Sequence, residues 1–176
     1  SCTGGSFHMK TVKQREQSST TMKMQAVTMF ISVDIGTRID FIKAYHKLTQ
    51  SNVALVAYRG FSNSEGAPTE EGIKQDSIAI LSHVLNNISN IDRTKVYLHG
   101  RSLGGAVAVY AATHSPEAKL VRGVILENTF TSMSHMVDAV LGRLSFLKHI
   151  ILRNHWKSEE IVHRVPAPIL FIKGKE

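Results

Sequence analysis

The apolar positions of this chain follow two patterns that alternate along its length. Runs of consecutive apolar residues, typical of strands buried on both faces of a sheet, lie at 26–33, 52–58, 95–99, 121–126 and 167–173. Helical spacing of apolar residues lies between them, at 38–48, from Pro68 to about Val84, and at 106–112. Because neighbouring parallel strands need a crossover connection, usually a helix, this alternation predicts an α/β fold with a mostly parallel sheet and flanking helices.

The N-terminal part of the chain is different in character. Residues 1–25 are polar and rich in Ser, Thr, Gln and Lys, and the alternating piece Phe7–Val12 predicts an edge strand. We therefore expect a polar N-terminal segment at 1–25 and a single α/β domain at 26–176, since 176 residues suit one compact domain.

Composition narrows the class of protein only a little. The chain is 43% hydrophobic and 20% charged, which is ordinary for a globular fold. Cys2 is the only cysteine, and no pair of the nine histidines has ligand spacing, so no metal site is expected. No run approaches the roughly eighteen apolar residues of a membrane-spanning helix. The chain begins with Ser1, so an anchor upstream and the localisation stay open.

The formal charge of +7 raises the question of an anionic partner. The basic residues are spread along the chain, without an arginine-rich run or an aromatic-interleaved basic motif, so nucleic acid is not expected as a partner. Two interpretations stay open, which are a solvated basic surface and contact with an anionic membrane surface.

The strongest chemical signal is the segment Gly100-Arg101-Ser102-Leu103-Gly104, a G-x-S-x-G placed between a strand and a small-residue helix. A nucleophilic serine projects from a sharp, strained strand-to-helix turn, and glycines two residues to either side let the neighbouring backbone pass. The motif predicts Ser102 as the catalytic nucleophile and Gly100 and Gly104 as the elbow glycines. Leu103 then lies at a helix N-terminus, where its amide can act as an oxyanion donor.

Two further blocks flank this motif, Tyr58–Gly66 (YRGFSNSEG) upstream and Glu127–Phe130 (ENTF) downstream. In this order the three blocks resemble the Bem46-like α/β-hydrolases of the alpha/beta hydrolase domain-containing protein 13 type, from about Met29 onward. The resemblance implies a serine hydrolase acting on an acyl ester or thioester of a small molecule or lipid, often associated with a membrane, with no cofactor. The alternative is a non-catalytic α/β-hydrolase-fold protein that binds a lipid or a protein partner.

The resemblance also implies which parts of the catalytic triad to look for. In chain order the acid and then the histidine follow the serine, with the acid just after the last strand. We therefore expect a chain truncated at its C-terminus, with both groups beyond Glu176. Glu176 itself would be poorly held, and for Glu127 a structural hydrogen-bonding role is favoured over that of the acid. His99 is expected to be packed, and surface or core roles are expected for His135, His149, His155 and His163.

Three features near the expected site differ from ordinary family members or allow more than one interpretation. The loop within 30–38 is shorter than the His-Gly-containing oxyanion loop of the relatives, and Asp34 lies in it, so half of the oxyanion hole is expected to be altered. Ala57 stands where relatives usually carry Asp. The amphipathic segment 134–156 predicts a lid-like insertion that faces an acyl chain or a membrane, or else packs on the core with its cations at the surface.

Overall fold

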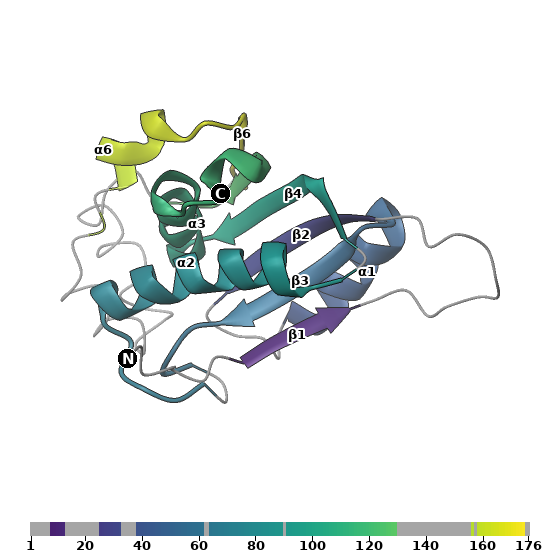
Figure 1. Ribbon diagram of the computed structural model, residues 1–176, viewed down its shortest axis with the longest axis horizontal. Coiled ribbons are helices and arrows are strands. Elements are labelled where there is room, and N and C mark those ends of the chain that lie inside the picture. The colour runs from purple at the N-terminus through teal and green to yellow at the C-terminus, as the bar shows by residue number, and fades with distance from the viewer. Residues whose placement is uncertain are drawn as a thin grey trace.

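Six strands form one sheet in the computed structural model (Figure 1). Their bounds are β1 His8–Val12, β2 Gln25–Ser32, β3 Asn52–Ala57, β4 Ile91–Arg101, β5 Val121–Glu127 and β6 Ile169–Ile172. Their order across the sheet is β1-β3-β2-β4-β5-β6, in which β1 pairs antiparallel with β3 and every other neighbouring pair is parallel. The residues that the structure describes are 8–12, 25–32, 38–61, 64–89, 91–129, 156 and 158–174.

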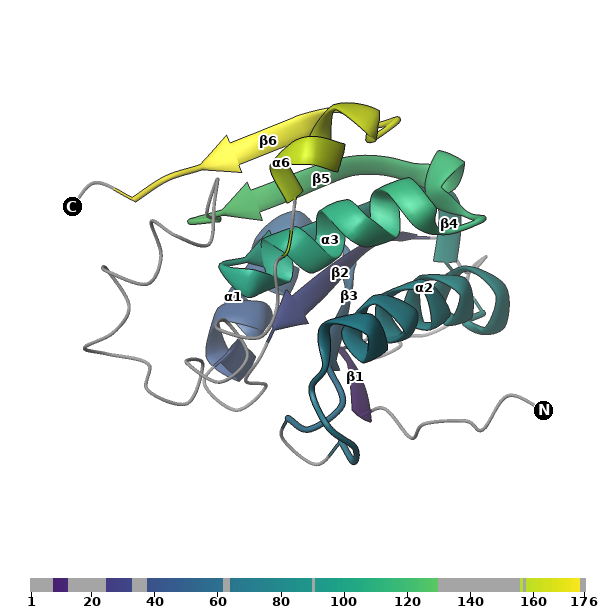
Figure 2. The same cartoon turned by 90° about the vertical axis from the view of Figure 1, so that its left-hand side faces the viewer.

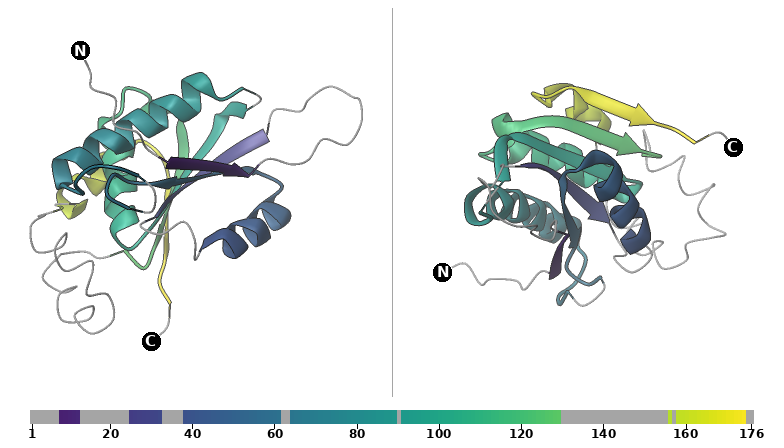
Figure 3. Two further views of the ribbon diagram at one scale, coloured as in Figure 1. Left: turned by 90° about the horizontal axis from the view of Figure 1, so that it is seen from below. Right: turned by 90° about the vertical axis from the view of Figure 1, so that its right-hand side faces the viewer.

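Helices cover both faces of the sheet. The longer ones are α1 Ile39–Thr49, α2 Glu70–Asn87 and α3 Leu103–His114, and the shorter ones are α6 Ser158–Ile161 and the 3-10 turns η2 Ala118–Leu120 and η4 Val162–Arg164. Figure 2 and Figure 3 show α2 and α3 on one face and α1 on the opposite face. No helix within the described ranges is both long and apolar enough to cross a membrane.

The side chains of β3 divide between the two cores. Val53, Leu55 and Ala57 face α1 and pack with Ile42, whereas the alternate residues Ala54 and Val56 join the larger core under α2 and α3. This alternation is the two-residue period of a strand, and burial on both faces is what the continuous apolar run at 52–58 predicts. The predicted helical stripe is buried in the larger core, at Ile73, Ser77, Ile80, Leu81 and Val84.

Several element boundaries differ from the prediction. The helix expected to begin at Pro68 begins at Glu70, because Thr69 is extended (φ −79°, ψ 152°) and its side chain accepts a hydrogen bond from the Gly72 N–H at 3.2 Å. Strand β4 starts at Ile91, four residues before the apolar run at 95–99, and α3 starts directly after Ser102. The four residues of α6 are too few to show a helical spacing of apolar positions, so the sequence does not predict this helix.

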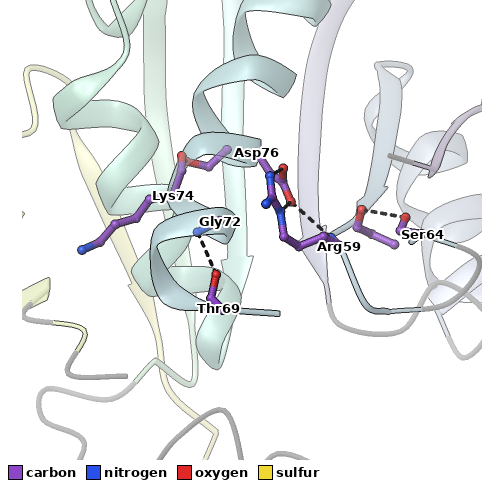
Figure 4. Close-up of polar contacts among 8 residues, drawn as sticks. Arg59, Ser64, Thr69, Gly72, Lys74 and Asp76 are labelled. Atoms are coloured by element: carbon purple, nitrogen blue, oxygen red, sulfur yellow. Dashed lines mark hydrogen bonds and ion pairs between the residues drawn. The ribbon is translucent and has the colours of Figure 1, made fainter. Parts of the chain in front are cut away.

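The connection from β3 to α2 is held by an ion pair between Arg59 and Asp76 (Figure 4). The Arg59 Nε and Nη2 atoms donate to the two carboxylate oxygens at 2.9 and 2.6 Å, and the Arg59 backbone N–H donates to Oδ2 at 3.2 Å. Gly72 lies against the guanidinium, and a Cβ there would be 2.7 Å from Arg59 Cδ. The turn itself closes through the left-handed Gly60 (φ 76°), whose N–H donates to the Ser64 carbonyl at 3.0 Å. The Arg59–Asp76 ion pair and the turn at Gly60 therefore form a structural clamp between β3 and α2.

Replacing Asp76 with Asn tests this clamp. Asp76→Asn keeps the shape of the side chain but removes the charge that receives three hydrogen bonds, in a side chain only 8% exposed. We expect the free energy of unfolding to fall by about 1–3 kcal/mol, measured by urea denaturation. Asp40→Asn is the matched control, because the Lys43–Asp40 pair is exposed and should contribute less than about 0.5 kcal/mol. Equal effects of the two substitutions would contradict the clamp.

Candidate active site

The carboxyl ends of the parallel strands lie at one edge of the sheet, where ligands bind in open α/β folds (Figure 2). Ser102 directly follows β4 at this edge, and Asn128 directly follows β5. The segment predicted to carry the nucleophile is therefore at the part of the fold that suits a reaction site.

Ser102 forms a strained turn between β4 and α3. Its backbone has φ 54° and ψ −124°, a region that residues other than glycine rarely adopt. The Ser102 N–H donates to the Glu127 carbonyl at 3.1 Å, and the Ser102 carbonyl accepts from the Gly105 N–H at 3.0 Å. The side chain is half-buried. This is the backbone conformation that a nucleophile elbow requires.

Glycines at the elbow permit a close crossing of two backbones. A Cβ on Gly100 would overlap the carbonyl group of Gly104, so the end of β4 and the first turn of α3 can approach only without that side chain. A Cβ on Gly105 would overlap the methyl group of Thr129, which follows β5. The sequence predicted the first crossing from the motif. It carried no signal for the second, which joins residues on two different elements.

Leu103 is the first residue of α3 and is buried. The first amides of a helix have no partner within the helix and lie at its positive end, so the Leu103 N–H is suited to face a developing negative charge. The Ser102 N–H is not available for this, because it donates to the Glu127 carbonyl. The loop expected to supply a second donor, with Asp34, lies outside the described residues.

A polar cluster around the buried His99 lies next to the elbow, on the face of the sheet that α1 covers. His99 is 4% exposed, its Nε2 is 3.2 Å from Glu127 Oε2, and the ring of Tyr45 packs edge-on against it. Arg101 Nε is 3.4 Å from the other carboxylate oxygen, Oε1. Burial lowers the pKa of His99, the Glu127 carboxylate partly opposes this, and Arg38 lowers it further. His99 is packed as expected, and Glu127 ties two strands together.

Other residues considered in the sequence lie elsewhere. His163 lies on η4 and is exposed. Glu176, His135, His149, His155 and most of the segment 134–156 lie outside the described residues, whereas Trp156 is described and buried. Within the described part of the chain, no group of three His, Cys, Asp or Glu side chains could hold a metal ion.

Comparison with known proteins identifies the family. The chain is 32% identical over 152 residues to the alpha/beta hydrolase domain-containing protein WAV2 of Arabidopsis thaliana, with 80% of this chain and 48% of that protein covered. It is 28% identical over 144 residues to protein bem46 of Schizosaccharomyces pombe, with 81% and 47% covered. The chain belongs with the Bem46-like α/β-hydrolases. It spans about half the length of the curated relatives that it matches.

Solved structures agree on the fold of this Bem46-like chain. An alpha-beta hydrolase from Vibrio vulnificus is 25% identical with a TM-score of 0.68, over 85% of this chain and 57% of that one. An esterase from Pyrobaculum calidifontis is 13% identical with a TM-score of 0.67, over 94% and 61%, which is a likeness of fold alone. No protein-family model matches the chain. The predicted α/β-hydrolase fold is confirmed.

Two glycine substitutions test the crossing at the elbow. In Gly100→Ala the new methyl meets the backbone of Gly104, whereas in Gly105→Ala it meets the Thr129 side chain. Each should lower the free energy of unfolding by about 1–3 kcal/mol. Adding Thr129→Ser, which removes the obstructing methyl, should restore stability to Gly105→Ala and not to Gly100→Ala. Urea denaturation of the double variants measures this, and equal rescue of both would contradict the geometry.

The lowered pKa of His99 predicts a loss of stability in weak acid. Its pKa in the folded chain lies below the ordinary value of 6.5, so the unfolded chain binds a proton more readily. The stabilisation is present above that value and decreases as the pH falls through it toward the folded pKa. The thermal midpoint should therefore fall between about pH 7.5 and about pH 5.5, with a shallower fall in His99→Gln. His163→Gln, at an exposed site, is the control and should retain the wild-type slope.

Proposed function

We propose that this chain carries the nucleophile of a serine hydrolase, with Ser102 attacking the carbonyl carbon of a small acyl ester or thioester. The observation that carries the proposal is the strained, positive-φ backbone of Ser102 (φ 54°, ψ −124°) at the start of α3. A strained turn of this kind persists only when its surroundings hold it, and such strain is concentrated at functional sites. Here the Glu127 carbonyl and the crossing at Gly100 hold it.

In the proposed reaction the Ser102 Oγ forms a bond to the acyl carbon and gives up its proton to a general base. The carbonyl oxygen becomes an oxyanion, which the Leu103 N–H stabilises at the positive end of α3. Collapse of this intermediate breaks the bond to the alcohol or thiol, which leaves with the proton. Water then hydrolyses the acyl-enzyme and regenerates the Ser102 hydroxyl.

The substrate class rests on the chemistry of the elbow and on likeness of fold. Besides the Pyrobaculum esterase, an acetyl xylan esterase from Paenibacillus has a TM-score of 0.68 at 11% identity. These proteins support small acyl esters as the first compounds to test. Contact with a lipid or an anionic membrane surface is a further part of the proposal, drawn from the apolar and basic residues of 134–156.

Labelling with a fluorophosphonate probe tests the nucleophile, because the probe reacts with an activated serine. We expect the full-length protein to incorporate one label, which peptide mass spectrometry places on Ser102, and its Ser102→Ala variant to incorporate none. Ser115→Ala, at the opposite end of α3, is the control that should label as the wild type does. Absence of label on the folded full-length protein, or equal label in Ser102→Ala, would overturn the proposal and favour a non-catalytic binding protein.

A further inference from the structure

The three residues at the end of β5 contact three different parts of the site. The Glu127 carbonyl accepts the Ser102 N–H at 3.1 Å, and its side chain meets His99 and Arg101 on β4. Thr129 lies with its methyl group against Gly105 of α3. Between them, Asn128 makes contacts in the opposite direction, toward β6. This turn therefore joins the nucleophile elbow to the last strand of the sheet.

Asn128 meets two requirements of this turn. Its backbone is left-handed, with φ 46°, and its N–H donates to the Ile172 carbonyl at 2.8 Å. Its side-chain Oδ1 accepts the N–H of Gly174, two residues beyond β6, also at 2.8 Å. Glycine would supply the positive φ without strain, but it has no side-chain acceptor. Asparagine tolerates the left-handed region and provides the acceptor as well.

These bonds place two distant segments of the chain on one short support. The Ser102 N–H donates to the Glu127 carbonyl, and the Gly174 N–H donates to the side chain of the next residue, Asn128. The Glu127 carbonyl and the Asn128 N–H belong to the same planar peptide group, so one rigid unit accepts from Ser102 and donates to Ile172 at the end of β6. The support lies at the carboxyl edge of the sheet, where parallel strands deliver their functional residues.

We propose that Asn128 is a positioning residue, which holds the chain leaving β6 at Gly174 in a set place relative to Ser102. This inference rests on the proposed function of Ser102 for its catalytic meaning. In α/β-hydrolases the residues that assist the serine follow it in chain order, so the exit from β6 is a route by which they reach the site. Asn128 acts through backbone placement and need not touch the substrate.

Two substitutions separate the roles of Asn128. Asn128→Gly keeps the positive φ and removes the acceptor for Gly174, whereas Asn128→Asp retains an acceptor oxygen and the tolerance of this backbone region. Amide exchange at Gly174, followed by NMR, should be about tenfold faster in Asn128→Gly and close to the wild-type rate in Asn128→Asp. Gln50→Gly is the matched control, since Gln50 is also left-handed (φ 53°) but ends α1, away from β6. It should leave the exchange at Gly174 unchanged.

The rate of fluorophosphonate labelling at Ser102 provides the second measurement. We expect a decrease of about three- to tenfold in Asn128→Gly at a thermal midpoint near that of wild type, with recovery in Asn128→Asp. Wild-type exchange at Gly174 in Asn128→Gly would overturn the inference, as would labelling that is slowed equally by Gln50→Gly. Failure of the full-length protein to label would overturn the proposed function alone, and the exchange at Gly174 would still decide whether Asn128 holds the chain.

Discussion

The close crossing of two backbones at the end of β4 is the constraint on which the site depends. The strand reaches Arg101, the chain reverses at Ser102, and α3 begins at once with Leu103. This path leaves no room for a side chain on Gly100, and it requires a positive φ at a serine. Strain of this kind amounts to about 1–3 kcal/mol and must be offset by surrounding contacts. The hydrogen bond from Ser102 to the Glu127 carbonyl is one of them.

Polar contacts also fix the chain segments that leave two of the strands, β3 and β5. On the side of α2, the carboxylate of Asp76 receives three hydrogen bonds from Arg59 and so fixes the chain leaving β3. On the side of β6, Asn128 joins the chain exits of two strands. The Asp76 side chain is buried, so it depends on Arg59 to replace the hydrogen bonds with water that it has lost, whereas Asn128 and Gly174 are exposed. Loops held in this way are suited to carry residues at fixed positions.

Much of the fold could be predicted from local pattern, and the failures have local causes. The helical stripe from Ile73 to Val84 and the continuous run of β3 are buried as their periods indicate, because those residues cannot be left in water without loss of stability. The start of α2 was placed too early, at Pro68, because a proline and an N-cap threonine in succession both mark a helix start. The beginning of β4 is not predicted, because the residues that follow Ile91 are polar and form no apolar run.

The sequence by itself determined the elbow, the class of fold and the family, because each depends on neighbouring residues. A G-x-S-x-G between a strand and a small-residue helix indicates a sharp, strained turn at the serine and a close backbone crossing at the glycines. Only the tertiary structure decided which residues support it. The partners of Ser102, Asn128 and Arg59 are 25, 46 and 17 positions away along the chain. Such contacts follow from the strand order β1-β3-β2-β4-β5-β6. That order is set by the packing of whole elements, which no local spacing of apolar residues records.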